Sequence, residues 1–343
     1  MSPRRTIVVV IAVLAASCTS GAASTRGLGP STAAPSAPGT ASPSPPSTPV
    51  LTSSSPHAAA ACGSSPTAGE GDGGGALVVF WSDSPIPSLW SVRPGGSGLH
   101  RLFRSDQNAK RPALSPDRRW VAFDGTPPGK PPLSVFHVQV ERVDGAGRRT
   151  IASRGSSQWE LDAQWSPDGR WLSFSRMPAG PDWRHSRIWT VRPDGTGAHR
   201  LGRGTSARWS PDGKYLVVSA TTPRSDGDIF MIDADGGGRH RLTATPDLEQ
   251  PAAWFPNGKK ILFTRFELDG GDVFVMKADG TQVRRLTTAS GDDIAGSWSP
   301  DGSKILFTSG RTGRSQLFVM DADGCNQRIL SPTPTYQFDP TWR

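Results

Sequence analysis

Short apolar runs alternate with polar turns along residues 76–343, and the alternation recurs at nearly constant intervals. Apolar runs such as residues 305–307 contain no polar position, so both faces of the corresponding strand are expected to be buried. This region shows no sustained helical periodicity, and the pattern predicts an all-β fold. The polar turns share the sequence Trp-Ser-Pro-Asp-Gly at 165–169, 209–213 and 298–302, with variants at 114–118 and 254–258.

The spacing of these turns predicts a propeller. Trp165, Trp209, Trp254, Trp298 and Trp342 stand 44 or 45 residues apart, and a repeat of that length is typical of a propeller blade. Each repeat predicts four short strands, because a second Asp-Gly turn separates its last two apolar segments. Asp and Gly tolerate the positive φ that hairpin turns require.

The two ends of the repeat region predict how the ring closes. Residues 76–103 supply the second, third and fourth strands of a unit but lack its first strand. Residues 338–343 supply a first strand with nothing after it. Joined, the two segments complete one blade and leave no open sheet edge. We therefore expect a six-bladed β-propeller of four-stranded blades, closed when the C-terminal first strand joins the N-terminal strands.

The repeat resembles a known family. Sequences of the form WSPDGxxIxF followed by VMDADGxxxRRLT resemble the WD40-like Pro-Asp repeat of the TolB family, over about residues 76–343. The resemblance implies a TolB-like propeller. TolB itself carries a separate α/β domain before its propeller, and we expect none in this chain. The resemblance is therefore to the propeller, and does not extend to TolB's role in the Tol–Pal envelope system.

The first 75 residues predict export and a membrane anchor. Residues 1–17 have two arginines followed by a short apolar run, which is typical of a secretory signal and too short to span a bilayer. Cys18 follows small residues and is the candidate lipidation site of a bacterial lipoprotein; the alternative is an ordinary signal peptide cut nearby. Residues 18–75 are rich in Ser, Thr, Pro, Ala and Gly and predict a disordered tether. We expect a protein anchored to the cell membrane and facing outside the cytoplasm.

Charge argues against a nucleic-acid partner. The chain has a formal net charge of +8, but its basic residues are scattered, many of them in the closing strands of the repeats. Nucleic-acid binding would require a clustered basic stripe with stacking aromatic residues. The expected partners are instead an envelope protein, a peptide or a polysaccharide. The membrane is a further partner, through the lipid expected at Cys18.

Cysteine and histidine positions predict no metal or cofactor. No Cys or His spacing in the sequence is typical of zinc sites. In an oxidising compartment Cys62 and Cys325 could form a disulfide, because each is expected beside the seam of the ring; the alternative is two unpaired thiols. His100, His199 and His240 each precede Arg-Leu in the fourth strands of different blades, and are expected far apart on the outer rim.

The turn aspartates are expected to be structural. Asp168, Asp212 and Asp301 recur at one position of the turn, where an Asp side chain commonly accepts hydrogen bonds from its own turn. The sequence around the second Asp-Gly turn lacks the further oxygen ligands and terminal Glu of a calcium loop.

Candidate binding residues lie at the entrance of the predicted first strands. Glu160, Glu249 and Asp293 each stand five positions before a repeat tryptophan, where Gly204 and Gln337 occupy the other copies. First strands line the channel of a propeller, so these carboxylates are expected to converge at the face that carries the longer loops. They are a candidate site for a cationic group; the alternative is that they are solvated loop acids.

Two tryptophans stand outside the repeat. Trp159 enters the third blade and Trp183 lies in that blade's long insertion, where exposed rings would offer stacking surface for a peptide or sugar; the alternative is loop packing. We therefore expect a binding or scaffolding protein that uses its loop face. An enzyme, a lyase or hydrolase of an envelope carbohydrate or peptide, is the weaker alternative, because no Gly-x-Ser-x-Gly elbow occurs.

Overall fold

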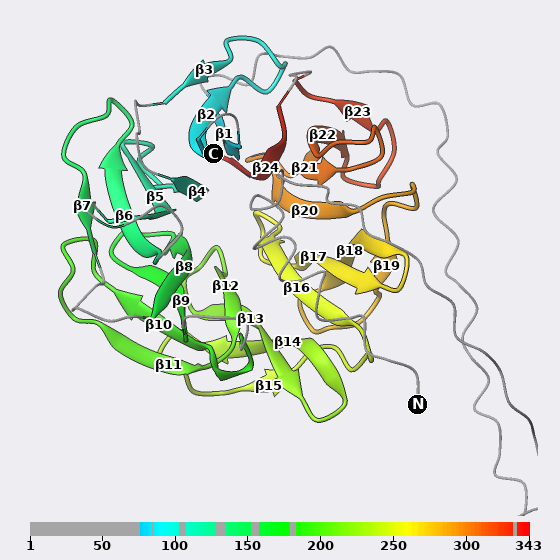
Figure 1. The fold of residues 1–343 in the computed structure, drawn as a ribbon. Helices are drawn as coiled ribbons and strands as arrows, with labels where there is room; N and C mark the ends of the chain where they lie inside the picture. Colours follow the sequence, from blue (N-terminus) through cyan, green and yellow to red (C-terminus); the bar gives the residue numbers. More distant parts are fainter. Residues whose placement is uncertain are drawn as a thin grey trace, which may run out of the picture. The chain divides into compact units, whose positions relative to one another are not determined.

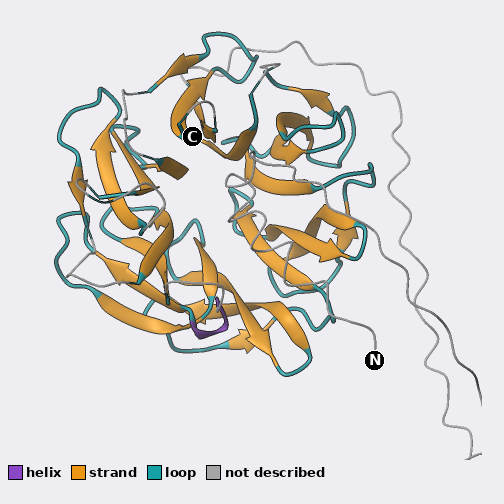
Figure 2. Cartoon of the chain, viewed as in Figure 1, coloured by secondary structure: helices purple, strands orange, loops and turns teal. Residues whose placement is uncertain are grey.

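The computed structural model describes residues 76–343 except 84–85, 103–107, 128–129, 131–134, 152–157, 179–182 and 332–334. The predicted signal segment and tether, with Cys18 and Cys62, lie outside these residues. The described part is all-β, as predicted, apart from one short 3₁₀-helix, η1 (Trp183–His185) (Figure 2). It includes no helix with the length and apolar character needed to cross a membrane.

The strands form sheets arranged in a ring (Figure 1), around a channel whose lining residues come from every sheet. In the described residues, four of these sheets are separate blades of four antiparallel strands. One blade joins β24 (Gln337–Trp342), β1 (Val78–Ser82), β2 (Ser88–Val92) and β3 (His100–Arg101). The next joins β4 (Ala109–Leu114), β5 (Trp120–Gly125), β6 (His137–Arg142) and β7 (Arg149–Thr150). The others join β8 (Trp159–Trp165), β9 (Leu172–Met177), β10 (Arg187–Val191) and β11 (His199–Arg203), and β20 (Asp293–Trp298), β21 (Lys304–Ser309), β22 (Gln316–Asp321) and β23 (Arg328–Ile329).

The remaining strands belong to one continuous sheet of eight. Its members are β12 (Thr205–Trp209), β13 (Tyr215–Thr222), β14 (Ser225–Asp233), β15 (His240–Arg241), β16 (Leu248–Trp254), β17 (Lys260–Glu267), β18 (Gly270–Lys277) and β19 (Arg284–Arg285). The prediction of six four-stranded blades is therefore wrong: the described chain has four such blades, and this larger sheet stands where two more were expected.

The junction inside the larger sheet explains the error. Strands β14 and β16 pair in parallel at Gly227 and Leu248. A Cβ at position 227 would lie 2.5 Å from Leu248 Cδ1 and 2.7 Å from Ser219 Oγ, so a larger residue would have to displace these two side chains. The Ser219 hydroxyl also donates a hydrogen bond of 2.6 Å to the carbonyl of Glu249. A close backbone approach of this kind leaves no trace in the repeat pattern.

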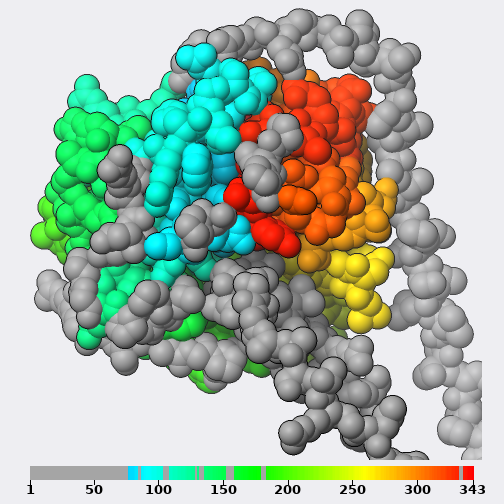
Figure 3. Space-filling model, turned by 45° about the horizontal axis from the view of Figure 1, so that its top comes forward, coloured from blue at the N-terminus to red at the C-terminus, as the bar shows by residue number. Residues whose placement is uncertain are grey.

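The ring closes through the two ends of the repeat region, as expected. Strand β24 pairs antiparallel with β1, with Val78 opposite Trp342 and Trp81 opposite Phe338. The rings of Trp81 and Phe338 stack with centroids 4.5 Å apart. In the space-filling view the red C-terminal residues lie against the strands coloured blue to cyan (Figure 3).

The hydrophobic core lies between neighbouring sheets. In β21, Ile305 and Phe307 pack with residues of β17 and β18, whereas Leu306 packs with residues of β1 and β2. All three side chains are inaccessible to solvent, so the prediction that both faces of this strand are buried is confirmed. Burial of each such side chain contributes about 1.5–3 kcal/mol.

The repeated turn is held together by its own side chains. The Ser166 hydroxyl donates to Asp168 Oδ1 at 2.6 Å and accepts from the Trp171 amide at 2.9 Å. Asp168 Oδ1 also accepts from the Arg170 amide at 3.0 Å, and Gly169 has φ of +71°. The same contacts recur in residues 210–215 and 299–304. The prediction that the turn aspartates bond within the turn is confirmed.

The tryptophan before the turn ties one sheet to the next. Trp165 Nε1 donates to the carbonyl of Ala113 at 3.0 Å, and Trp254 Nε1 donates to that of Arg208 at 3.0 Å. Each bond runs from one first strand to the preceding one. In these two copies the tryptophan therefore connects a first strand with the preceding one, whereas Nε1 of Trp209 and of Trp298 has no hydrogen-bond partner among the described residues.

Candidate functional site

The channel has two chemically different ends. Its wall is formed by the strands β4, β8, β12, β16, β20 and β24, which we call the inner strands (Figure 1). The Trp-Ser-Pro-Asp-Gly turns follow these strands, so we call that end of the channel the turn end. The opposite end, where the inner strands begin, is the loop end.

The three predicted carboxylates occupy equivalent places at the loop end, but they are not open to solvent. Glu160, Glu249 and Asp293 begin β8, β16 and β20, and each side chain is 0% exposed. Each pairs at 2.8 Å with an arginine that its hairpin brings alongside; the three partners are Arg176, Arg265 and Arg311. A burial of this kind is stable only when the charge is paired.

The arginines are the partly exposed members of these pairs. Their side chains are 16–20% exposed, and their guanidinium groups lie over aromatic rings of the same sheet. Arg176 lies 4.3 Å from the ring centroid of Trp189, and Arg265 lies 4.5 Å from that of Phe274. The loop end therefore presents partly exposed guanidinium groups, each paired with a buried carboxylate.

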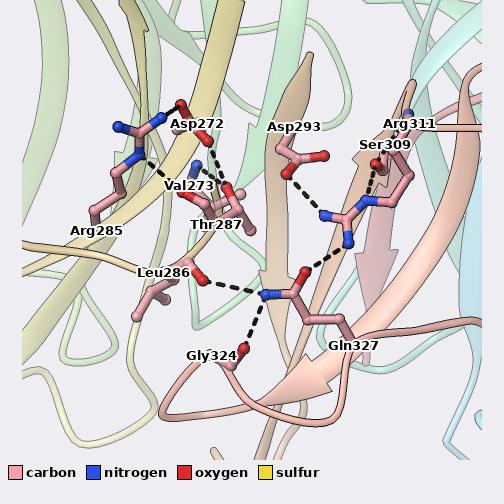
Figure 4. A network of polar contacts seen from close by, with 10 residues as sticks. All are labelled: Asp272, Val273, Arg285, Leu286, Thr287, Asp293, Ser309, Arg311, Gly324 and Gln327. Atoms are coloured by element: carbon pink, nitrogen blue, oxygen red, sulfur yellow. Dashed lines mark hydrogen bonds and ion pairs between the residues drawn. The ribbon is translucent and has the colours of Figure 1, made fainter. Parts of the chain in front are cut away.

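The pair in β20 shows how such an arginine is fixed (Figure 4). Arg311 donates to Asp293 Oδ2 at 2.8 Å, to Ser309 Oγ at 2.7 Å and to Gln327 Oε1 at 2.7 Å. Gln327 in turn donates to the carbonyls of Leu286 and Gly324. Burial raises the pKa of Asp293 above its usual range, while the Ser309 hydrogen bond and Arg311 oppose that shift. Burial likewise raises the pKa of Glu249.

Glu160 has a second partner from the neighbouring blade. His137 Nδ1 lies 3.2 Å from Glu160 Oε2, and His137 is 5% exposed. With Arg176 these residues form a buried cluster across two sheets. The repeat pattern does not predict this cluster, because His137 and Glu160 come from different repeats.

Aromatic rings gather at the loop end beside this cluster. We call the set the loop-end aromatic chain; its members are Tyr336, Phe338, Trp81, Phe136 and Trp159. Tyr336 stacks on Phe338 with centroids 6.3 Å apart, and Phe338 stacks on Trp81. Tyr336 is 45% exposed.

The chain of rings continues through a lysine to Trp159. Lys110 Nζ lies 4.9 Å from the ring centroid of Trp81 and 5.8 Å from that of Phe136. The Phe136 ring meets Trp159 edge-on, with centroids 5.8 Å apart, and Trp159 is half-buried. The rings come from three adjacent blades, and only Trp159 was singled out from the sequence.

Trp183 has a different environment. It begins the helix η1 and is half-buried, with the Arg184 guanidinium 5.6 Å from its ring centroid. Arg184 also pairs with Asp226 of β14 at 2.9 Å. Trp183 is thus linked through Arg184 to β14 of the eight-stranded sheet, whereas Trp159 belongs to the loop-end aromatic chain.

Cys325 is buried in the turn after β22 and takes part in a disulfide. The other cysteines, Cys18 and Cys62, are outside the described residues, so its pairing with Cys62 stays a prediction. Within the described residues no cluster of three or more His, Cys, Asp or Glu side chains is arranged to hold a metal ion.

Between the two ends, the channel wall carries a charged network that the sequence did not reveal. Arg111 Nη1 donates to Asp124 Oδ2 at 2.7 Å, and Arg208 Nη1 donates to Asp162 Oδ2 at 2.8 Å. The Asp162 amide donates to Asp124 Oδ1 at 2.8 Å, which joins the two pairs. Burial raises the pKa of Asp124 to about 7, and Arg111 opposes the shift.

A signal for this network was present in the repeat. Three places before Leu114 and before each repeat tryptophan, the inner strands carry different residues: Arg111, Asp162, Ser206, Pro251, Ala295 and Asp339. Four of these residues have positive φ, between 47° and 59°, although none is glycine. An alignment of the repeat copies would have shown that this position carries a charged residue in three of the six inner strands.

Comparison with known proteins connects this architecture to a family. Residues 222–339 match the family described as the Tricorn protease N-terminal beta propeller domain. Two curated relatives, each named Protein TolB homolog, come from Chlorobium luteolum and Chlorobium chlorochromatii. They are 34% identical to this chain over 135 and 193 residues, which is 39% and 55% of it. The matches cover 27% and 31% of the relatives, so the chain spans less than a third of their length.

Solved structures agree on the fold. The crystal structure of TolB from Acinetobacter baumannii superposes with a TM-score of 0.66 and 20% sequence identity. The superposition covers 79% of this chain and 67% of that chain. The repeat sequence, the ring of sheets and these matches agree, and the chain therefore carries a TolB-like β-propeller.

Proposed function

We propose that this chain is an exported, lipid-anchored binding or scaffolding protein whose partner docks at the loop end of the channel. The partner is a protein, a peptide or an envelope polymer. The observation that carries the proposal is the loop-end aromatic chain, which brings rings from three blades together beside the arginines of the inner strands. Aromatic and arginine side chains supply most of the binding free energy at typical protein interfaces.

The predicted residues take different parts in this site. Trp159 and Trp183 are the proposed contacts, because both residues are half-buried and neither is part of a repeat position. Glu160, Glu249 and Asp293 act indirectly, because each is buried and holds an arginine at 2.8 Å. A carboxylate that fixes a guanidinium group reduces the entropy lost when that group binds a partner.

The proposed partner is best identified by affinity capture of the anchored protein from its own envelope, followed by the same capture with Trp159→Ala. We expect the variant to lose the partner. The matched control is Arg170→Gln, which changes an 83% exposed side chain in a turn and is expected to capture the same partner. Equal capture by Trp159→Ala would contradict a site at the loop end.

The anchor is proposed at Cys18. At about 0.8 kcal/mol for each buried CH₂, two or three acyl chains hold a protein stably at a membrane, whereas one does not. Metabolic labelling with an alkyne fatty acid is expected to mark the wild type and not Cys18→Ser. Label on both proteins, or on neither, would contradict the anchor.

A second candidate function is an enzyme, a lyase or hydrolase acting on an envelope carbohydrate or peptide. In its favour is the cluster of His137, Glu160 and Arg176, because a His beside a carboxylate is a pairing that acid–base catalysis uses. Against it, His137 is 5% exposed and Glu160 is 0% exposed, whereas a general base has to reach its substrate. Turnover of the captured ligand that is lost in His137→Gln would establish the enzyme and contradict a purely binding role.

A further inference from the structure

The turn end of the channel holds a cavity of about 430 Å³ that is charged on one side. Its lining includes Pro167, Pro211 and Pro300 of the repeated turns, which locates it at the end opposite the loop-end aromatic chain. Strands β4, β8, β12 and β24 contribute charged residues to the wall, whereas β16 and β20 contribute small residues such as Ala253 and Ala295. The wall is therefore polar on one half and nearly neutral on the other.

The two arginines within the cavity retain hydrogen-bonding capacity. Arg111 and Arg208 are 16% and 19% exposed. Among the described residues, Arg111 donates from Nη1 to Asp124. Arg208 donates from Nη1 to Asp162 and from Nε to the carbonyl of Ala252. A guanidinium group has five N–H donors, so both arginines have further donors for a ligand in the cavity.

The mouth of the cavity adds positive charge. Four arginines and two aspartates are among its lining residues, and two of the arginines, Arg118 and Arg343, are exposed. Arg118 has φ of +57° at the turn position where the other copies have glycine. A non-glycine residue in this conformation costs on the order of 1 kcal/mol, and such strain is typically retained where it serves a function.

We infer that this cavity is a second binding site, and that it takes an acidic peptide, whose carboxylate groups bind Arg111 and Arg208. Charge-assisted hydrogen bonds between guanidinium and carboxylate are strong and directional. The small residues of β16 and β20 leave space for the peptide on the opposite half of the wall. The site does not depend on the function proposed for the loop end.

The neighbours of Arg111 give the site a pH dependence. Arg111 faces Asp124, Asp162 and Asp339, with Arg208 beyond Asp162. A bound carboxylate competes with Asp124 for Arg111, and protonation of Asp124 removes that competitor. Because the pKa of Asp124 is about 7, affinity is expected to increase as the pH falls from 8 to 6.

The test uses the full chain and a fluorescein-labelled hexapeptide of alternating Asp and Ala, titrated by fluorescence anisotropy at low salt. We expect binding that weakens with salt, and at least tenfold weaker binding by Arg111→Gln. A matched peptide with Asn in place of Asp is expected not to bind. Arg170→Gln, an exposed arginine in a turn, and Trp159→Ala at the loop end are expected to bind like the wild type.

A second variant tests the inference if Arg111→Gln does not fold. Thr341→Asp adds a carboxylate at a half-buried position of the cavity wall without removing an ion pair, and is also expected to weaken binding at least tenfold. Wild-type affinity in both variants, or equal binding of the Asp and Asn peptides, would overturn the inference. Preferential binding of inorganic polyphosphate would overturn the peptide as occupant, and a loss confined to Trp159→Ala would overturn the location.

Discussion

The turns and the inner strands of this propeller follow the same repeat, but their copies agree to different degrees. In the turns, Ser, Asp and Gly recur together and make the same hydrogen bonds in residues 166–171, 210–215 and 299–304. In the inner strands the backbone repeats while the side chains differ. Equivalent positions hold Arg111, Asp162 and Ala295. The comparison teaches that the side chains that agree in the turns serve the architecture, whereas the inner strands carry recurring carboxylate–arginine pairs at the loop end and residues that differ among copies further along.

Ring closure depends on the inner strand β24. Deletion of residues 338–343 removes the partner of β1 and the ring stacked on Trp81. The deletion exposes the paired edge of β1 and removes the half-buried rings of Phe338 and Trp342, so the melting temperature is expected to fall by on the order of 10 °C, or the protein to aggregate. Cooperative melting at the wild-type temperature, measured by circular dichroism, would show that β24 does not close the ring.

The buried Asp124 beside the inner strands predicts a pH dependence of stability. Its pKa is raised to about 7 in the folded protein, so the folded state binds a proton that the unfolded state releases at a lower pH. The free energy of unfolding is therefore expected to decrease as the pH rises from about 4 to about 7, by on the order of 3–4 kcal/mol from this residue. Urea titrations of the wild type and Asp124→Asn measure the difference. Parallel curves for the two proteins would contradict the assignment.

The arginine–carboxylate pairs predict a somewhat smaller effect. Arg265→Gln leaves Glu249 buried without its ion-pair partner, which is expected to lower the free energy of unfolding by roughly 3 kcal/mol. Arg170→Gln provides the matched control in a turn, because its pair with Asp168 is exposed and 3.9 Å long, and such pairs contribute less than about 1 kcal/mol. Chemical denaturation of both variants tests the contrast, and equal losses would mean that burial of Glu249 has no energetic consequence.

Local features of this molecule were predictable from the sequence, and tertiary ones were not. The turn could be interpreted because Ser166, Asp168 and Gly169 contact one another within a few residues. The convergence of Glu160, Glu249 and Asp293 on one end of the channel followed from the repeat, but their burial did not. Their arginine partners lie 16 or 18 residues further along, and only the hairpin register brings them alongside.

Contacts between repeats were even harder to predict from the sequence. The pairing of β14 with β16 uses the space beside Gly227. A single glycine in the sequence of a strand does not indicate that another strand lies next to it. His137 meets Glu160, and Phe136 meets Trp159, across the gap between two blades. A repeat pattern describes each blade separately, so it contains no information on which side chains of adjacent blades touch.

The central claim is that the proposed partner binds the inner strands at the loop end and that the recurring turn aspartates serve only the architecture. Titration of the captured partner against Trp159→Ala and Asp212→Ala tests it most directly. Trp159→Ala is expected to lose about 2 kcal/mol of binding free energy, roughly thirtyfold in affinity. Asp212→Ala removes the acceptor of the Ser210 and Lys214 hydrogen bonds, and is expected to lower the melting temperature while its folded fraction binds normally. Normal binding by Trp159→Ala together with weakened binding by Asp212→Ala would place the site at the turns and contradict the account.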